Sequence, residues 1–392
     1  MKKKISIIGS TGSIGYTTLN LLNKKNSYQV YILTGNNSYK RIIEQIKKFK
    51  PKIFIIFAKK TYLKVKKKYK KKKIVILNSK NYLNYKYKKS DISIAAIPGI
   101  AGLKPTLKLL EISKKILIAN KESVICGWQL IKKNANKNKV KIIPIDSEHF
   151  SIMKLLQGEN TKNLEKIYLT ASGGPFLKYS SKKMKNIKPY DAIKHPKWKM
   201  GKKISVDSAT LMNKIFEVVE AQKLFDIKLN KIEILIHPES LVHAILKFKN
   251  GLYKFLYFNH DMSIPIGNAI FEKEFNYYNL GKSSNKSQNL KLEKTLNFSK
   301  VNKKKFPAIK LKPILDKYSS LPIILNAGNE IFVDQFLKNN ISFYSIISNL
   351  FKLLKHKKMR KYAIKNPSNY NNILSIDEWA RNEAMRMINK KK

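Results

Sequence analysis

The stretch from Ile5 to Gly15 reads ISIIGSTGSIG, a short apolar run that leads directly into a glycine-rich loop. The run is typical of a buried β-strand, and the apolar pattern that continues to Leu22 is typical of a helix. Glycines let the backbone turn sharply and approach a pyrophosphate, to which the N-terminus of the helix offers N–H donors. A tight turn without a ligand explains the pattern less well, so we predict a dinucleotide-binding strand–loop–helix unit.

Similar apolar runs recur through the first 145 residues and are separated by helical patterns. They are Lys4–Ile8, Gln29–Leu33, Lys52–Phe57, Lys73–Leu77, Ile92–Ile97, Lys115–Ala119 and Val140–Pro144. Strands that alternate with helices indicate right-handed βαβ units and a parallel sheet. The predicted fold class is therefore α/β, with an N-terminal Rossmann-like domain over residues 1–145.

The rest of the chain is predicted to form two further domains. An α+β central catalytic domain over residues 146–278 is indicated by strand patterns at Lys166–Ala171, Lys231–Ile236, Leu241–Lys247 and Tyr253–Phe258. A C-terminal helical bundle over residues 306–392 is indicated by helical patterns at Pro322–Leu337, Phe343–Leu354 and Ile376–Ile388. Between them, residues 279–305 are rich in Lys, Asn and Ser, which predicts a linker.

The composition excludes several classes of protein. The 392 residues carry 80 Lys+Arg against 25 Asp+Glu, a net charge of +55, yet 43% of them are hydrophobic and can form buried cores. Only four of the cations are arginine, the residue that specific nucleic-acid recognition favours. We therefore expect the surplus lysines to be mostly solvated surface, with no specific nucleic-acid partner.

Cysteine usage and hydropathy indicate the compartment. The single cysteine, Cys126, excludes an internal disulfide and a multi-cysteine zinc site. No apolar run reaches the ~18–20 residues of a membrane span. We expect a soluble, cytoplasmic protein that does not interact with membranes.

The end of the second predicted strand bears on the choice of nucleotide. Thr34-Gly35-Asn36-Asn37-Ser38 lacks the Asp or Glu that holds the free ribose 2′-hydroxyl in NAD sites. Lys40 and Arg41 follow and could neutralise a 2′-phosphate, which favours NADP(H). Two surface cations at the start of a helix would explain the pattern nearly as well.

Polar residues follow two later strands, at the sheet edge where open α/β sheets bind ligands. Asn120, Lys121 and Glu122 follow one strand, and Asp146 and Glu148 follow another. In an extended segment the last two point to the same side, where they could hold Mg²⁺ or Mn²⁺. A pair of acids alone is usually solvated surface, so a third carboxylate is needed.

The segment from Ile204 to Glu220 could supply that carboxylate. Asp207 or Ser208 is predicted to cap the N-terminus of a helix, on which Asn213, Glu217 and Glu220 share one stripe. The apolar neighbours of this stripe leave little polar surface unless the stripe faces a site.

Two loops complete the candidate site. Ser172 lies in TASGGPF, residues 170–176, where hydroxyls and a Gly-Gly turn suggest an anion-binding nest. His195 and Trp198 lie in a loop that contains Pro and Gly, which suggests a lid over a site. A plain turn and a loop packed on its own domain are the alternatives.

Together these motifs closely resemble the 1-deoxy-D-xylulose 5-phosphate reductoisomerase family. The matching motifs are GSTGSIG at 9–15, ANKES at 119–123, DSEH at 146–149, TASGGPF at 170–176, HPKWKMGKKISVDSATLMNK at 195–214, HPESLVHA at 237–244 and NAGNE at 326–330. The resemblance implies an enzyme of isoprenoid precursor biosynthesis that uses NADPH and Mg²⁺, Mn²⁺ or Co²⁺ to make 2-C-methyl-D-erythritol 4-phosphate. Its reaction would be a retro-aldol and re-aldol rearrangement followed by hydride transfer, and the resemblance also suggests a homodimer.

The resemblance also implies a role for individual residues. The cofactor contacts would be Thr11, Gly12, Ser13, Ile14, Gly35, Asn36, Asn37, Asn120, Lys121, Glu122 and Gly201. The metal ligands would be Asp146, Glu148 and Glu217. The substrate contacts would be Ser147, Glu148, Ser172, His195, Trp198, Ser208, Asn213, Lys214 and Glu217, with Trp198 on a flap over residues 192–202. The catalytic residues would be Glu148, Lys121, His195 and Lys214.

Some positions fall outside these assignments. His149, His237 and Glu220 are expected to be structural. Asn36 stands where the family often has Lys, which bears on binding of a 2′-phosphate.

Three other functions remain open from the sequence. One is a two-domain NADP oxidoreductase that needs no metal, which sensitivity to a chelator would separate. Another is a lysine-rich nucleic-acid-binding protein, which predicts steep salt dependence and no NADPH oxidation. The last is a degenerate enzyme, against which the intact polar positions argue.

Overall fold

The computed structural model describes residues 2–23, 27–195, 197–198, 201–277, 295–367 and 369–389. The chain divides into two compact units. Unit 1 comprises Met1–Ser123, Leu130–Phe150 and Asp261–Leu292, and unit 2 comprises Val124–Gln129, Ser151–His260 and Glu293–Lys392. Over the described ranges, no helix combines the length and the apolar character needed to cross a bilayer.

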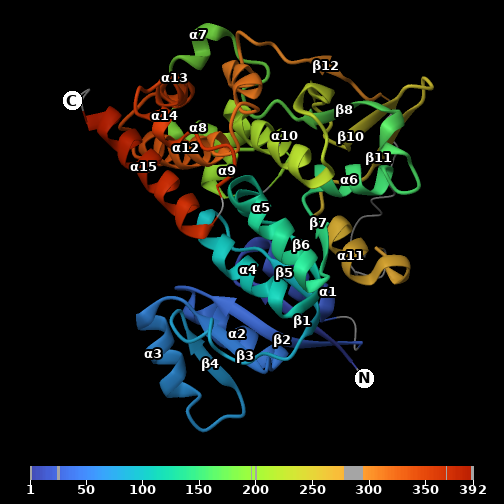
Figure 1. Ribbon diagram of the computed structural model, residues 1–392, viewed down its shortest axis with the longest axis vertical. Helices are drawn as coiled ribbons and strands as arrows, with labels where there is room; N and C mark the ends of the chain where they lie inside the picture. The colour runs from blue at the N-terminus through green and yellow to red at the C-terminus, as the bar shows by residue number, and fades with distance from the viewer. Residues whose placement is uncertain are drawn as a thin grey trace. The chain divides into compact units, whose positions relative to one another are not determined.

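Unit 1 is built on a seven-stranded sheet in the order β4-β3-β2-β1-β5-β6-β7, in which every neighbouring pair is parallel (Figure 1). Its strands are β1 (Lys3–Ile8), β2 (Tyr28–Gly35), β3 (Ile53–Ile56), β4 (Val75–Asn78), β5 (Ser90–Ala95), β6 (Ser113–Ile118) and β7 (Lys141–Pro144). The seven predicted strands are confirmed, with small shifts at their ends. Ile7, Ile32 and Phe54 are fully buried because helices cover both faces of the sheet.

The helices of unit 1 follow from the strand order. They are α1 (Ser13–Leu22), α2 (Tyr39–Phe49), α3 (Lys59–Lys68), α4 (Leu103–Glu111), α5 (Lys121–Asn138), α6 (Ser147–Leu155) and α11 (Ser263–Phe271), with 3₁₀ turns η1 (Ile100–Gly102) and η4 (Glu272–Glu274). Residues Val124–Gln129 of α5 and the end of α6 from Ser151 belong to unit 2. The order runs outward from β1 in one direction and then from β5 in the other. Right-handed crossovers therefore place the two series of helices on opposite faces, and the strand order reverses between β1 and β5.

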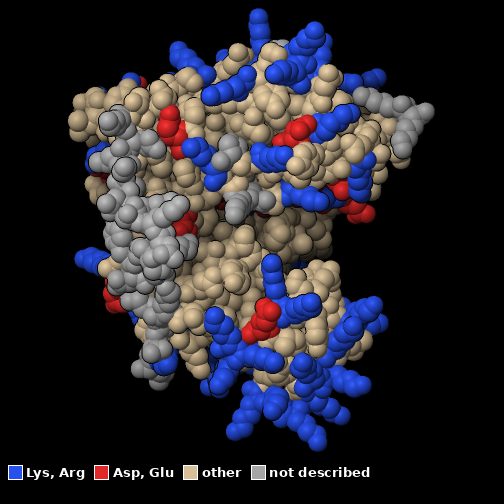
Figure 2. All heavy atoms as spheres, turned by 180° about the vertical axis from the view of Figure 1, so that it is seen from behind, with Lys and Arg blue, Asp and Glu red and all other residues tan. Residues whose placement is uncertain are grey.

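Lysines crowd one end of unit 1, at α3 and the turn that follows it. Figure 2 shows this group at the bottom of the view, and its exposed members are Lys64, Lys66, Lys67, Lys68, Lys70, Lys71, Lys72 and Lys73. Their side chains extend into solvent, as expected for a surplus of charge that plays no part in the core.

Unit 2 contains a five-stranded mixed sheet in the order β11-β10-β8-β9-β12. Its strands are β8 (Leu164–Ala171), β9 (Ile232–Ile236), β10 (Val242–Phe248), β11 (Tyr253–Tyr257) and β12 (Ser299–Lys300). Only the β8–β9 pair is parallel among these described strands, which confirms the α+β architecture. The short β12 falls within the predicted linker 279–305, of which residues 279–294 lie outside the described ranges.

Helices make up the remainder of unit 2. They are α7 (Ser181–Met184), α8 (Pro189–Ala192), α9 (Lys202–Thr210), α10 (Met212–Phe225), α12 (Leu321–Leu337), α13 (Phe343–Leu354), α14 (Met359–Tyr362) and α15 (Tyr370–Asn389), with 3₁₀ turns η2 (Thr161–Asn163), η3 (Leu229–Lys231) and η6 (Pro307–Ile314). The predicted C-terminal bundle is confirmed, since α12, α13 and α15 pack together. Gly328 allows α12 to approach α13, because a Cβ there would lie 2.5 Å from Leu353 Cδ2.

Candidate active site

The glycine loop of unit 1 has the geometry of an anion-binding turn. Gly9 adopts a φ of +92°, and a Cβ at this position would lie 2.6 Å from the carbonyl oxygen of Ala96. A Cβ at Gly15 would lie 2.5 Å from Gly9 O, so the start of α1 packs directly on the loop. Gly12 caps α1 without a side-chain hydrogen bond, and the first turn carries no acidic residue. The positive end of the helix dipole is therefore available to a phosphate.

The side chain of Arg41 lies at this loop and forms a hydrogen bond with it. Its guanidinium Nη1 donates to the carbonyl oxygen of Thr11 over 2.7 Å. Gly35 lies beside the same loop, since a Cβ there would be 3.2 Å from Thr11 Cγ2. Asn36 and Asn37 are exposed at the end of β2. This arrangement suits a nucleotide with an extra phosphate on its ribose, and it singles out Arg41 from the two nearby cations.

Asn120 connects the carboxyl ends of β5 and β6. Its Oδ1 accepts from the backbone N–H of Ser123 over 2.9 Å, which caps α5. Its Nδ2 donates to Gly99 O over 3.0 Å and also to Ile97 O. Both ends of the side-chain amide, and the backbone N–H group that donates to Ala95 O, are thus used by the protein.

Asp146 and Glu148 lie at the start of a helix, and not in the extended segment that the sequence predicted. The extended conformation is wrong, because α6 begins at Ser147 and Glu148 lies in its first turn. The backbone N–H of Glu148 approaches Asp146 Oδ1 at 3.3 Å, and Ser147 Oγ donates to Glu148 Oε2 over 2.7 Å. The start of a helix therefore orients these carboxylates, which no two-residue repeat could do.

Two buried side chains hold Asp146. Lys121 Nζ lies 3.4 Å from its Oδ2, and His149 Nδ1 lies 3.1 Å from its Oδ1. His149 is fully buried, and the sequence analysis gave it only a structural role. Its three-residue spacing from Asp146 at the start of a helix was the signal that could have revealed this contact.

In unit 2, the predicted N-cap at Asp207 or Ser208 is wrong. Both residues lie inside α9, which starts after Gly201 and ends where Leu211 adopts a φ of +67°. This left-handed residue breaks the helical run, and α10 begins at Met212. No glycine marks the break, so the sequence offered no sign of it.

The first two turns of α10 contain three of the predicted site residues. Asn213 donates through Nδ2 to Glu217 Oε1, and Lys214 Nζ lies 2.5 Å from Glu217 Oε2. Lys214 and Glu217 are buried, as is Glu220 one turn later. The polar stripe is therefore turned away from bulk solvent, and the buried lysine balances the buried carboxylate.

Ser172 and Ser208 are brought together by the Gly173-Gly174 turn. A Cβ at Gly174 would lie 3.1 Å from Ser208 O, so the turn after β8 packs on the backbone of α9. Ser172 Oγ accepts from the backbone N–H of Gly174 over 3.1 Å and lies 3.1 Å from His195 Nε2.

His195 is held as the neutral imidazole. Its Nδ1 accepts from the backbone N–H groups of Lys197 and Trp198 over 3.2 and 2.9 Å, which places the ring proton on Nε2. Burial, with help from Lys214 and His260, lowers the pKa of His195 to about 4. The Nε2–H group then donates to Ser172, whose own hydroxyl proton remains available for an anionic ligand.

Trp198 packs against the rings of His243 and His260, which the sequence motifs did not identify as site residues. Its ring centroid lies 6.2 Å from that of His243 and 5.8 Å from that of His260, both edge-to-face. His243 in turn stacks on Phe258 at 4.2 Å. Of the predicted flap 192–202, Pro196, Lys199 and Met200 lie outside the described residues. His243 could have been noticed in the motif HPESLVHA, whereas His260 stands in none of the quoted motifs.

Each unit thus gathers its own part of the predicted site. The residues in unit 1 are Thr11, Gly12, Ser13, Ile14, Gly35, Asn36, Asn37, Asn120, Lys121, Glu122, Asp146, Ser147 and Glu148. The residues in unit 2 are Ser172, His195, Trp198, Gly201, Ser208, Asn213, Lys214 and Glu217.

Comparison with known proteins covers nearly the whole chain. The family model for 1-deoxy-D-xylulose 5-phosphate reductoisomerase matches residues 5–127, its C-terminal domain model matches residues 142–225, and a further model, the DXP reductoisomerase C-terminal domain, matches residues 259–383. A 1-deoxy-D-xylulose 5-phosphate reductoisomerase of Pelagibacter ubique is 43% identical over 383 residues, covering 96% of this chain and 97% of the relative. One of Wolbachia pipientis is 41% identical over 88% of each chain.

Solved structures agree with these relatives. A crystal structure of DOX-P reductoisomerase in complex with NADPH, fosmidomycin and magnesium has a TM-score of 0.89 and 32% identity, covering 99% of this chain and 98% of the other. The enzyme of Zymomonas mobilis in complex with NADPH has a TM-score of 0.87 and 31% identity, covering 99% of each chain. With this agreement in sequence, architecture and motif order, the chain belongs to the 1-deoxy-D-xylulose 5-phosphate reductoisomerase family.

Proposed function

We propose that this protein converts 1-deoxy-D-xylulose 5-phosphate into 2-C-methyl-D-erythritol 4-phosphate, with oxidation of NADPH and with a divalent cation, Mg²⁺ or Mn²⁺, as cofactor. The observation that carries the proposal is the 43% identity to a reductoisomerase over 96% of the chain. The polar side chains described above also support it, because they include candidates to hold the metal, the cofactor and the substrate phosphate. The reaction supplies precursors for isoprenoid biosynthesis.

The proposed metal ligands are Asp146 and Glu148 of unit 1 and Glu217 of unit 2. Among the described residues, each of these three acids offers one carboxylate oxygen that could hold a metal ion. An all-carboxylate set fits Mg²⁺ or Mn²⁺, which prefer hard oxygen ligands. Glu217 is 1% exposed, and its buried partner Lys214 compensates its charge when no cation is bound. When bound, the cation would act as a Lewis acid that stabilises negative charge developing on the substrate oxygens.

The proposed cofactor site lies at the carboxyl ends of β1 and β5, where the strand order reverses. The uncapped N-terminus of α1 and the close-packed Gly9 and Gly15 fit a pyrophosphate. Arg41 at the carbonyl oxygen of Thr11 fits the 2′-phosphate of NADPH, and it offsets the absence of a lysine at Asn36. NADPH would supply the hydride that reduces the rearranged aldehyde.

We propose that Ser172, Ser208, Asn213 and Lys214 bind the substrate phosphate. Lys214 contributes charge, and the Ser172 hydroxyl donates a proton because it already accepts from Gly174 and His195. Neutral His195 adds no charge that would vary between pH 5 and 8. Binding of the phosphate orients the reacting end of the sugar, so an unphosphorylated sugar should lose turnover as well as affinity.

Glu148 and Lys121 are the proposed groups for proton transfer and charge balance. Ser147 fixes one oxygen of Glu148, so its carboxylate has a defined direction from which to take a proton from a substrate hydroxyl. Lys121 is buried and lies beside Asp146. Its cation compensates the negative charge that gathers on this side of the site.

Trp198 is proposed to close over the bound sugar. Its contacts with His243 and His260 give the flap a defined resting place on unit 2. A closed aromatic flap excludes water from a reactive aldehyde and enolate. Gly201, at the end of the same segment, would bring the backbone close to the cofactor.

We further propose that the ranges 1–145, 146–278 and 306–392 act as the cofactor-binding, catalytic and C-terminal supporting parts, and that the protein is a cytoplasmic homodimer. The edge strand β11 supports dimerisation, because Leu252, Tyr253 and Phe255 are exposed there and a sheet edge is a template for pairing. Sedimentation of wild-type protein and of Phe255→Lys tests this: a dimer that becomes monomeric supports the interface, and an unchanged dimer contradicts it.

The decisive experiment follows NADPH absorbance with 1-deoxy-D-xylulose 5-phosphate. Substrate-dependent oxidation that EDTA abolishes and Mg²⁺ restores supports the proposal. Oxidation that persists in EDTA indicates a metal-independent oxidoreductase, and no oxidation in the presence of Mg²⁺ contradicts the proposal. Fosmidomycin, present in a related structure, serves as a second probe, since it should inhibit the Mg²⁺-restored activity.

A further inference from the structure

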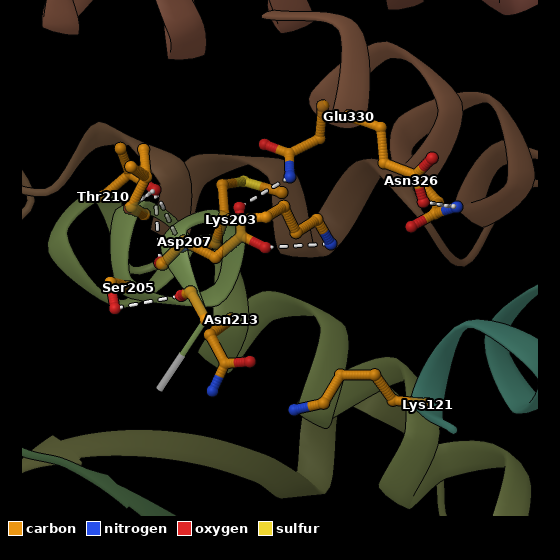
Figure 3. Close-up of polar contacts among 12 residues, drawn as sticks. Lys121, Lys203, Ser205, Asp207, Thr210, Asn213, Asn326 and Glu330 are labelled. Atoms are coloured by element: carbon orange, nitrogen blue, oxygen red, sulfur yellow. Dashed lines mark hydrogen bonds and ion pairs between the residues drawn. The ribbon is translucent and has the colours of Figure 1, made fainter. Parts of the chain in front are cut away.

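Asp207 is a buried carboxylate in the middle of the segment that carries the proposed phosphate and metal contacts. It is 1% exposed and lies directly before Ser208 in α9. Its partners are Lys203, with Nζ 2.9 Å from Oδ2, and Asn329 of α12, whose Nδ2 donates to Oδ1 over 2.7 Å. Figure 3 shows Asp207 and Lys203 beside α12, the helix that carries Asn326 and Glu330. Asp207 therefore faces the protein interior and connects two helices.

Asn329 is an unusual choice of residue for its position. It is fully buried in the middle of α12, and its Oδ1 has no hydrogen-bond partner among the described residues. A leucine or methionine would bury this position without an unsatisfied carbonyl, which costs free energy. Packing alone thus disfavours the amide, and what the amide adds is its N–H bond to Asp207.

Asn326 provides an internal comparison. It is also fully buried, lies one turn earlier on the same helix, and likewise has an Oδ1 without a partner among the described residues. Its Nδ2 donates to Glu330 Oε1 over 3.3 Å, within α12. The two asparagines therefore match in burial and chemistry, but only Asn329 has a hydrogen bond to α9.

The hydrogen bond reaches α9 one turn before its break. Leu211 holds a left-handed conformation, and Thr210 Oγ1 donates back to Val206 O and Asp207 O at 3.1 and 3.2 Å. Ser208 lies on one side of the break, and Asn213 and Lys214 lie on the other. Their relative positions depend on this one corner, and the corner is fixed to the rest of unit 2 in part through Asp207.

We propose that Asp207 and Asn329 are positioning residues: the hydrogen bond between α12 and α9 holds the corner at Leu211 in the geometry that lets Ser208, Asn213 and Lys214 bind the substrate phosphate together. The inference rests on the proposed function of those three residues. Because a displacement of about 1 Å can cost ~100-fold in rate, loss of the bond should lower kcat/KM for the sugar phosphate by ~10- to 100-fold. The KM for NADPH should change much less, because its proposed phosphate contacts lie in unit 1 and only Gly201, at the N-cap of α9, is a proposed cofactor contact in unit 2.

The test compares Asn329→Leu with the matched control Asn326→Leu. Both variants remove a buried amide from α12, so both should shift the thermal midpoint to a similar extent. Only Asn329→Leu should raise the KM for 1-deoxy-D-xylulose 5-phosphate. If both variants leave that KM unchanged, or both raise it equally, Asn329 has no positioning role.

An exchange of partners keeps the test decisive if the leucine variants do not fold. Asn329→Asp places two carboxylates together and should raise the KM for the sugar phosphate, whereas the double variant Asp207→Asn with Asn329→Asp restores one donor and one acceptor. Recovery of the KM in the double variant supports the proposal, and no recovery in a folded double variant overturns it.

Amide hydrogen exchange separates this inference from the proposed function. Backbone amides from Ser208 to Glu217 should exchange faster in Asn329→Leu and in Asn329→Asp than in Asn326→Leu. If exchange is faster in the Asn329 variants but the wild-type protein does not turn over the sugar phosphate, the positioning role of Asn329 is supported and the proposed reaction is rejected. If the wild-type protein is active but the Asn329 variants exchange their amides at the wild-type rate, the proposed reaction is supported and the positioning role is rejected.

Discussion

Lys214 and Glu217 form a buried ion pair one turn apart at the start of α10, with Nζ 2.5 Å from Oε2. Both side chains belong to the proposed site, one as a phosphate contact and the other as a metal ligand. A buried pair of this kind is costly to desolvate, and removal of one partner leaves the other charge uncompensated. The pair therefore connects the stability of unit 2 with its proposed chemistry.

Glu217→Gln should show both effects. The variant leaves Lys214 buried without its countercharge, so the free energy of unfolding should fall by about 3–5 kcal/mol. Activity should fall by more than ~100-fold, and the dependence on Mg²⁺ should weaken. Urea unfolding and a Mg²⁺ titration of NADPH oxidation measure these changes. Glu233→Gln, which breaks an exposed pair with Lys166, is the control and should cost at most ~1 kcal/mol. An unchanged Mg²⁺ titration in Glu217→Gln would show that Glu217 is not a metal ligand.

Asp146→Asn should abolish metal-dependent turnover while the glycine loop of unit 1 stays intact. The substitution keeps the shape of the side chain but removes the charge that faces Lys121 and His149. NADPH fluorescence in the absence of metal should report cofactor binding like that of the wild type. Wild-type turnover in this variant would contradict the ligand assignment, and loss of NADPH binding would show that the substitution acts through the fold.

His195 should make stability depend on pH in a defined window. Its pKa in the folded protein is about 4, below the ordinary value of 6.5. Below pH 6.5 the unfolded chain takes up a proton that the folded protein does not. The contribution of His195 to stability is therefore fully present above pH 6.5 and is lost as the pH falls toward 4. His195→Gln should lose less stability than the wild type between pH 6.5 and 4, as measured by urea midpoints. Parallel pH profiles of the two proteins would refute the buried neutral ring.

Arg41→Gln should change nucleotide preference. If Arg41 contacts the 2′-phosphate, its loss should raise the KM for NADPH by about tenfold, the equivalent of one charge-assisted hydrogen bond. The KM for NADH, which lacks that phosphate, should stay the same. Lys40→Gln is the neighbouring control and should have a smaller effect on both. Equal changes for the two nucleotides would show that Arg41 only supports the loop through Thr11.

Trp198→Ala should lower turnover by about 100-fold while the protein keeps its fold, because Trp198 is partly exposed and its proposed role is closure over the substrate. Trp198→Phe keeps an aromatic ring against His243 and His260 and should recover part of the activity. Circular dichroism and steady-state kinetics provide the measurements. Near-normal turnover of Trp198→Ala would refute the flap.

Local patterns in the sequence were enough to predict the seven strands of unit 1 and, in unit 2, four strands and three helices. The seven apolar runs of unit 1 became seven parallel strands, and the glycine loop became the start of α1, because strand and turn preferences depend on neighbours within a few residues. The same reasoning was wrong for Asp146 and Glu148, which it placed in one extended segment, although α6 begins between them at Ser147. It was also wrong at Asp207, because Leu211 is a residue type that carries no signal for a left-handed break.

The sequence by itself determined the α/β architecture, the order of the motifs and the chemical types of the candidate ligands. Only the tertiary structure decided which distant side chains meet. Arg41 reaches Thr11 across 30 positions, and Asn329 reaches Asp207 across 122. The low pKa of His195 likewise depends on burial and on Lys214 and His260, which are distant in sequence. Such contacts form because packing an entire unit fixes the relative positions of its helices and loops, and no local stretch of residues contains that information.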